Sequence, residues 1–161
     1  MPGELCLTNR QKTRSIDSRL LRRITRFLLE EHFGLRNYEF CLHLVPASEM
    51  ARINEQFLNH VGSTDVITFD YSTPLQRSHL SGEVFICVDE AVRQAREFRT
   101  TWQSELVRYT VHSLLHLQGY DDLQPHARRK MKREEGALLK RTAVIFKLAR
   151  LHKSKRRSRA S

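Results

Sequence analysis

Several short stretches of this chain are rich in apolar or β-branched residues, one of them in alternation with polar positions, and these stretches predict β-strands. Residues 4–8 form a short apolar run, and residues 38–45 alternate until Pro46 stops the pattern. Residues 82–88 are β-branched and aromatic through their middle, and residues 62–71 resemble a strand entered through a turn. Such runs, bounded by turn residues, are typical of strands. We therefore expect about four strands.

Between these strands the apolar positions recur every three or four residues, which indicates helices. The first helix follows a capping residue, Ser15 or Asp17, and ends at Gly34. The same spacing predicts four more helices, which cover residues 48–57 with Ser48 as the cap, residues 89–98 with Asp89 as the cap, a segment from about Glu105 to 118, and residues 125 to about 140, or as far as 150. The last of these carries many basic residues and few apolar ones, so we expect it to be mostly exposed.

Together these elements predict an α+β fold, in which one small mixed β-sheet of about four strands packs with about five helices. The composition, 40% hydrophobic and 29% charged residues, is that of an ordinary globular protein. We expect one domain over residues 1–149 and a basic, disordered tail over residues 150–161. Residues 72–81 lack periodicity and contain Pro74, which predicts a loop.

The formal charge of +10 is concentrated at the C-terminal end and points to a polyanionic partner. Without the basic residues of the tail the charge falls to about +4. RNA is the expected partner, with an anionic membrane surface second. The helix over residues 16–34 also has arginines off its apolar stripe, for which a solvated face is the favoured interpretation. The predicted RNA-binding residues of the tail are Arg150, Lys153, Lys155, Arg156, Arg157 and Arg159.

The chain has no apolar run long enough to span a membrane, and its first residues lack the layout of a secretory signal. We therefore expect a soluble cytoplasmic protein. Its three cysteines, Cys6, Cys41 and Cys87, lie singly in apolar segments, which favours reduced thiols that pack in the core.

Two histidines four residues apart, His112 and His116, are the main chemical feature of the sequence. On a helix they project side by side, and Gly119 then allows a left-handed turn that brings the following carboxylates back over the helix end. Two hydrogen-bonded, half-buried histidines are the structural alternative. The following acids favour a metal site instead, with Asp122 as third ligand ahead of Asp121 and then His126.

The pattern differs from that of a zinc protease, because Ser113 occupies the position at which such enzymes have the glutamate that acts as general base. Three segments instead resemble the YbeY endoribonuclease family. The segment HSLLHLQGYDD (residues 112–122) resembles the family motif His-Gly-x-Leu-His-Leu-x-Gly-Tyr-Asp-His, whose histidines bind zinc. STDVITF (63–69) resembles Pro-Thr-Asp-Val-Leu-Ser-Phe, and GEVFICVD (82–89) resembles Gly-Asp-Ile-x-Ile-x-x-Asp, in the same order.

The chain departs from the family pattern at two positions. The third zinc histidine falls on Asp122, which can still bind zinc. The arginine that the family carries before Thr-Asp-Val falls on Leu58, which removes a cation that could hold a phosphate. The resemblance implies one Zn²⁺ per chain, held by His112, His116 and Asp122.

The resemblance also implies the function: a metal-dependent endoribonuclease specific for single-stranded RNA, acting in ribosomal RNA maturation and ribosome quality control, with the small ribosomal subunit as a partner. The alternative is a non-catalytic ribosome-assembly protein with a structural zinc. No catalytic side chain is assigned beyond a metal-bound water, and Asp65 and Glu83 are candidates because they lie in matched segments. In the predicted loop, Arg77 and His79 are weaker candidates for substrate contact. His43 has no evident partner in the sequence and is predicted to be structural.

Overall fold

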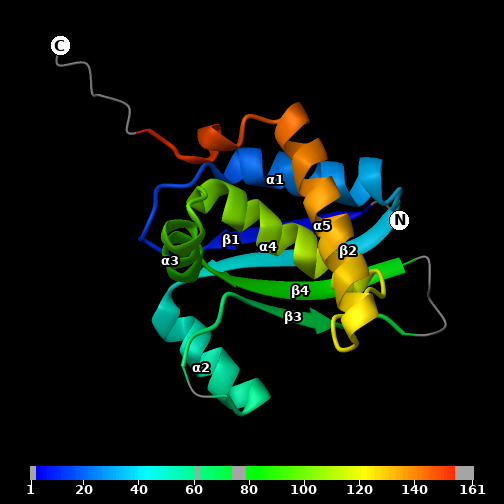
Figure 1. Ribbon diagram of the computed structural model, residues 1–161, viewed down its shortest axis with the longest axis horizontal. Coiled ribbons are helices and arrows are strands. Elements are labelled where there is room, and N and C mark those ends of the chain that lie inside the picture. The colour runs from blue at the N-terminus through cyan, green and yellow to red at the C-terminus, as the bar shows by residue number, and fades with distance from the viewer. Residues whose placement is uncertain (1–2, 61, 74–78, 155–161) are drawn as a thin grey trace.

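A four-stranded mixed sheet forms the framework of the protein, as the sequence predicted (Figure 1). The computed structural model describes residues 3–60, 62–73 and 79–154. The strand order is β1-β2-β4-β3, in which β1, β2 and β4 are parallel and β3 is antiparallel to β4. The strands are β1 (Glu4–Asn9), β2 (Asn37–Val45), β3 (Val66–Asp70) and β4 (His79–Cys87).

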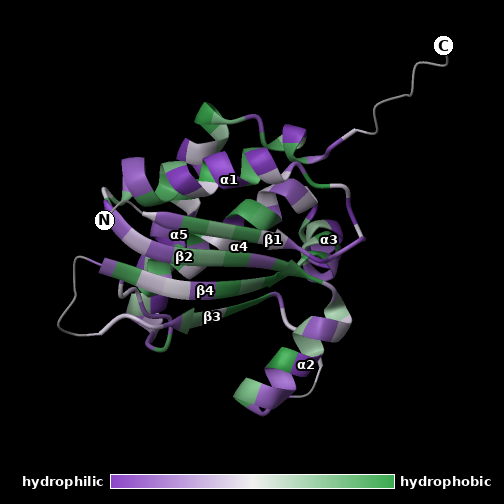
Figure 2. Ribbon diagram, turned by 180° about the vertical axis from the view of Figure 1, so that it is seen from behind, coloured by the Kyte–Doolittle hydropathy of each residue, from purple (hydrophilic) through white to green (hydrophobic). Residues whose placement is uncertain are grey.

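Five α-helices within the described residues complete the predicted α+β fold. They are α1 (Ser18–Arg26), which continues as a π-helix (Phe27–His32), α2 (Ala47–Leu58), α3 (Val88–Phe98), α4 (Trp102–Leu117) and α5 (Pro125–Ile145). Helices α1, α4 and α5 cover one face of the sheet (Figure 1). Figure 2 shows the opposite face, where α2 lies at one corner and most of the sheet is left uncovered. None of the helices in the described part of the chain is long and apolar enough to cross a membrane.

The main core lies between the sheet and the covering helices, because strand residues alternate between the two faces, and a smaller buried cluster includes Met50 and Ile53 of α2. On β4, Leu80, Val84 and Ile86 are buried toward α4, whereas Glu83 and Phe85 point to the opposite face. Helix α4 contributes a wide buried surface to this core, and this explains its central position. Its buried apolar residues are Leu106, Val107, Tyr109, Val111, Leu114 and Leu115.

The helix starts show where the sequence prediction was right and wrong. Asp17 caps α1 by accepting a hydrogen bond from the Leu20 N–H at 3.1 Å, as predicted. The prediction that Asp89 caps its own helix was wrong. Its carboxylate accepts hydrogen bonds from the Ala47 N–H at 3.0 Å and from the Thr13 hydroxyl. Asp89 therefore serves the first turn of α2, and the predicted cap of α2, Ser48, lies inside that helix.

Helix α4 begins at Trp102, earlier than the expected start near Glu105, because Thr101 provides a cap. The Thr101 hydroxyl accepts a hydrogen bond from the Ser104 N–H at 3.1 Å. Strand β4 begins at His79, so the predicted loop is shorter at its C-terminal end. Arg77, the other loop candidate for substrate contact, lies outside the described residues.

The last helix matches the prediction, but the segment after it is more integrated than the sequence suggested. Helix α5 buries one narrow face, formed by Met131, Glu135, Leu138 and Thr142, and its other residues are exposed or partly exposed, which confirms the expectation of a mostly exposed helix. A 3-10 helix, Leu148–Leu151, follows, and its last residue is fully buried. The folded part therefore extends past the boundary predicted at residue 149. Among the predicted RNA-binding residues, Arg150 and Lys153 are exposed, and Lys155, Arg156, Arg157 and Arg159 lie outside the described residues.

Candidate metal centre

Helix α4 presents His112 and His116 on one side of its last turns. The two Nε2 atoms lie 3.2 Å apart, and both side chains are partly exposed. The neighbouring Val111, Leu114 and Leu115 are buried in the core. Because residues four apart on a helix share a face, the buried stripe fixes the direction in which both imidazoles point. The pair predicted from the sequence is therefore formed at the edge of the core.

The end of α4 brings a carboxylate next to the two imidazoles. Gly119 has a φ of +96°, and its N–H donates to the carbonyl of His116 at 3.0 Å. The Tyr120 N–H donates to the carbonyl of Leu115, also at 3.0 Å. This pair of bonds is the Schellman arrangement that closes a helix around a left-handed residue. The chain then turns back, and Asp122 Oδ2 lies 3.6 Å from His116 Nε2.

His112, His116 and Asp122 form a cluster that could hold a metal ion, since one ligand atom from each lies within 4.8 Å of the others. A tetrahedral zinc site with bonds of about 2.1 Å places its ligand atoms about 3.4 Å apart. The distances of 3.2 and 3.6 Å within the cluster are close to this value. Two imidazole nitrogens and one carboxylate oxygen are also a donor set that suits zinc. The residues present therefore fit a divalent metal.

The two rival ligands are engaged or placed elsewhere. The carboxylate of Asp121 accepts a hydrogen bond from the Leu123 N–H at 2.8 Å, which closes the turn before α5. His126 is exposed in the first turn of α5. Neither belongs to the cluster. The order of preference expected for the third ligand, with Asp122 first, is consistent with this geometry.

Glu135 on α5 lies next to His112, on the side of the ring away from His116, and the sequence analysis did not identify it as a site residue. Its side chain is buried, and Oε2 lies 3.6 Å from His112 Nδ1, the ring nitrogen that does not face His116. Burial lowers the pKa of His112, but the hydrogen bond and charge of Glu135, with the charges of Asp122 and Asp65, raise it overall. Carboxylates in this position orient metal-binding histidines and increase their basicity. The position of this acid on the apolar stripe of α5 was the sequence feature that could have indicated a buried, functional carboxylate.

A cleft of about 1000 Å³ opens beside the cluster between β3, α4 and α5. Asp65 lines it from the start of β3, where its Oδ1 accepts a hydrogen bond from the Val66 N–H at 2.8 Å. Two cations also line the cleft, Arg108 one turn before His112 and Lys132 on α5. The Arg108 guanidinium lies 3.8 Å from Glu135 and 3.6 Å from Glu105. The cleft thus combines the cluster with groups that can contact an anionic substrate.

Leu58, at the end of α2, lines the same cleft and is 42% exposed. The position at which the resemblance implied an arginine is therefore an apolar part of the cleft rim. Arg108 and Lys132 supply positive charge within the same cleft. The cleft therefore contains cations even though position 58 is a leucine and not an arginine.

Glu83, the second acid considered for catalysis, lies on the opposite face of the sheet from the cleft. Its carboxylate is 3.7 Å from His43 Nε2, and the Thr8 hydroxyl lies 2.6 Å from His43 Nδ1. The imidazole of His43 also stacks on Phe85, with ring centroids 4.7 Å apart. His43 therefore does have partners, in agreement with a structural role. Of the two acids, only Asp65 lies near the metal cluster.

Known proteins resemble this chain in sequence and in fold. A family model described as "Endoribonuclease YbeY" matches residues 6–143. A Chlorobium luteolum protein named "Endoribonuclease YbeY" is 36% identical over 126 residues, which cover 78% of this chain and 89% of that protein. One of the same name from Chlorobium phaeovibrioides is 43% identical over 91 residues, 56% of this chain and 60% of that protein. The solution structure of a Thermotoga maritima protein has the same fold, with a TM-score of 0.68 at 24% identity over 97% of this chain and 100% of that one.

Proposed function

Since the chain belongs to the YbeY endoribonuclease family, we propose that it is a zinc-dependent endoribonuclease that cleaves single-stranded RNA. Ribosomal RNA is the proposed substrate, and maturation and quality control of the small ribosomal subunit are the proposed setting. The free cysteines Cys6, Cys41 and Cys87 suit the reducing cytoplasm, where we place the protein.

The observation that carries this proposal is a group of three side chains that could bind one metal ion and that lies at the wall of an open cleft. Catalytic zinc sites keep one coordination position free of protein ligands, whereas structural sites normally have four. A divalent metal bound here would acidify a coordinated water and polarise a phosphate oxygen. The cleft would admit the substrate to that free position.

The residues around the cluster have complementary tasks in this proposal. His112, His116 and Asp122 bind the metal, and Glu135 holds His112 in the orientation that directs Nε2 toward it. Arg108 and Lys132 neutralise phosphate charge in the cleft. Asp65 is the candidate for holding a proton or a substrate hydrogen bond, because it is the sequence-predicted acid that lines the cleft.

The alternative is an RNA-binding ribosome-assembly protein with a structural metal. Leu58 at the cleft rim favours this alternative, because it adds no phosphate contact. The open cleft beside a three-ligand cluster favours the enzyme. The two functions differ in one observable property, which is whether bound RNA is cut.

Digestion of a labelled single-stranded RNA by zinc-loaded protein tests the proposal. We expect cleavage by the parent and a loss of at least 100-fold in rate for His112→Ala, because removal of a ligand leaves the metal weakly held. Exposed His126→Ala is the matched control and should cut at the parental rate. Binding of the RNA by metal-loaded parent without any cleavage would support the assembly protein instead.

A further inference from the structure

Helix α1 carries a continuous basic stripe on its solvent side. Its buried side is formed by Leu21, Ile24 and Thr25. The exposed positions are spaced by three, one and three residues, so they lie on one face of the helix. These positions are Arg19, Arg22, Arg23 and Arg26.

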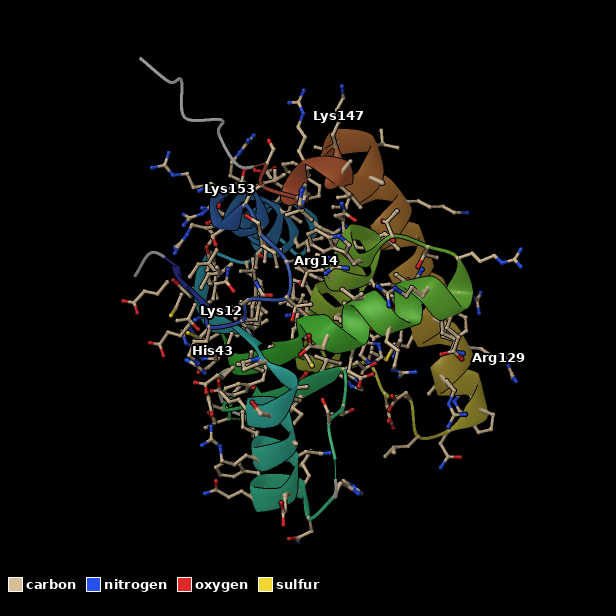
Figure 3. The ribbon with its side chains drawn as sticks, turned by 90° about the vertical axis from the view of Figure 1, so that its left-hand side faces the viewer. Lys12, Arg14, His43, Arg129, Lys147 and Lys153 are labelled. Atoms are coloured by element: carbon tan, nitrogen blue, oxygen red, sulfur yellow. The ribbon has the colours of Figure 1, made fainter. Side chains whose placement is uncertain are left out.

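The C-terminal segment lies against α1 and extends this stripe. The Asp17 N–H donates to the Leu151 carbonyl at 2.9 Å, and the Lys153 N–H donates to the Ser15 carbonyl at 2.9 Å. Farther along, the guanidinium of Arg23 lies 5.8 Å from the ring centroid of Phe146. Figure 1 shows this red segment beside α1, and Figure 3 shows Lys147 and Lys153 at the same end of the molecule.

Two regions far apart in the sequence thus form one cationic surface, here called the α1 surface. Residues 14–26 and 141–154 contain a single acid, Asp17, and its carboxylate is used as the cap of α1. Within the described residues, the cations of this surface form no ion pair with a carboxylate. Their charge is therefore available to an anionic partner. The α1 surface consists of Arg19, Arg22, Arg23, Arg26, Arg141, Lys147, Arg150 and Lys153.

We infer that the α1 surface binds the phosphate backbone of double-helical RNA. Proteins that bind single strands usually stack bases on exposed aromatic rings. Here Arg23 covers the Phe146 ring, and the Arg141 guanidinium lies 5.5 Å from the centroid of the Phe27 ring. The rings are occupied by the protein's own cations. An outward-facing row of cations without free stacking partners suits a backbone, and RNA duplexes are recognised largely through backbone and shape.

This inference rests on the proposed function, and it specifies the form of the substrate. Helix α5 connects the cleft to the α1 surface, and its 21 residues span about 30 Å. Its exposed side continues the positive charge with Arg129, Lys132, Arg133 and Lys140. An RNA with its single strand in the cleft would therefore place an adjoining helix on the α1 surface. The preferred substrate is a single strand next to a duplex.

Binding of two labelled RNAs to the zinc-loaded full chain tests this inference. One RNA is a hairpin with a single-stranded extension, and the other is the extension alone. Fluorescence anisotropy gives the affinity at several salt concentrations for RNAs with a cleavage-resistant backbone, and a gel verifies that they stay intact. Unmodified RNAs of the same sequences are used to compare cleavage. The test variants are Arg19→Gln/Arg26→Gln and Lys147→Gln/Lys153→Gln. The control is Arg52→Gln/Arg96→Gln, which removes two exposed arginines from α2 and α3.

For the hairpin RNA, we expect the slope of log affinity against log salt to flatten by about 0.9 for each phosphate that the protein no longer neutralises, or about 1.8 for each test variant. For the extension alone, the slopes of the test variants should equal the parental slope. The control variant should have the parental slope on both RNAs. Equal slopes for test variants and control would overturn the inference. Equal losses of affinity on both RNAs would also overturn it. If the parent cuts single strands but shows no preference for the hairpin RNA, the inference is wrong and the proposed function stands.

Two further outcomes separate the possible failures. A parent that neither binds nor cuts either RNA contradicts the proposed function, and the inference fails with it. Vesicles rich in phosphatidylserine provide the other comparison, because Val144 and Ile145 are exposed close to the α1 surface. If the test variants lose vesicle binding but keep the parental slope on hairpin RNA, the surface binds membranes and the inference is wrong.

Discussion

The carboxylate of Glu135 lies 3.6 Å from Nδ1 of His112, and Nε2 of the same ring faces His116. The carboxylate thus approaches the ring nitrogen that is not directed at the metal cluster. Glu135 is buried, so water cannot readily replace it as the partner of this imidazole. This relationship leads to the first prediction.

Glu135→Gln should lower the affinity for zinc by about 10- to 100-fold, as expected when the partner of a metal-binding histidine loses its charge. Competition with a chromophoric chelator measures the affinity. Glu134→Gln on the same helix is the matched control and should bind like the parent. Equal zinc affinity for Glu135→Gln and the parent would show that Glu135 does not support the metal site.

The third metal ligand can be identified by substitution. Asp122→Ala should lose most of the bound zinc, whereas Asp121→Ala and His126→Ala should retain it, because only Asp122 belongs to the cluster. Elemental analysis of protein purified without chelator gives the metal content of each variant. If Asp122→Ala keeps a full equivalent and Asp121→Ala does not, the assignment moves to Asp121.

Removal of the metal should lower the stability of the fold, because the cluster ties the end of α4 to the turn that precedes α5. At a free metal concentration of 100 times Kd, binding contributes about 2.7 kcal/mol to the free energy of unfolding. A thermal unfolding scan with and without a chelator measures the difference. Asp122→Ala should show little response to chelator, and a parent with the same Tm in both conditions would contradict the prediction.

Tyr109 offers a test of a buried polar group near the cleft. Its side chain is 3% exposed, and within the described residues its hydroxyl has no hydrogen-bond partner. Tyr109→Phe should therefore raise the free energy of unfolding by about 1 kcal/mol. Tyr38→Phe should lower it by about the same amount, because that hydroxyl donates to Glu30 at 2.7 Å. Urea unfolding of both variants measures these changes, and a destabilised Tyr109→Phe would indicate a partner such as water.

Leu58→Arg should strengthen RNA binding in the cleft by about five-fold, because it places a cation at an exposed rim position. An ion pair of this exposed kind is worth on the order of 1 kcal/mol. The binding of a short single-stranded RNA, measured at one salt concentration, gives the change. Leu123→Arg is a control, since Leu123 is also exposed but does not line the cleft. Equal gains from both substitutions would reflect net charge alone.

Much of the fold and the centre of the site could be predicted from local patterns. Short apolar or β-branched runs, and alternation in residues 38–45, located the four strands, and helical spacing located five helices, because these patterns reflect which face of an element is buried. His112 and His116 followed from the geometry of one helix. Gly119 followed from the need for a left-handed residue at the helix end, and its φ of +96° confirms this prediction.

Contacts between distant elements could not be predicted in this way. Glu135 reaches His112 only because α5 packs against α4. The position of this acid on the apolar stripe of α5 indicates burial, but it does not show which helix the acid meets. Asp89 was expected to cap its own helix, but the fold brings Ala47 to its carboxylate. Glu83 was considered with Asp65 because both lie in motifs, yet the alternation of β4 places it on the other face of the sheet. Its partner there, His43, is likewise a tertiary neighbour.

The contact between the C-terminal segment and the start of α1 also governs when the protein can finish folding during synthesis. Ile16 pairs with His152 in an isolated bridge, and fully buried Leu151 belongs to the same core as Ile16. These partners are separated by about 135 residues of chain, which a ribosome adding 5–20 residues per second makes in roughly 7 to 27 s. During that interval α1 lacks its partner and leaves apolar surface uncovered. Nascent chains of this protein therefore pass through a stage at which chaperones can bind them before the core closes.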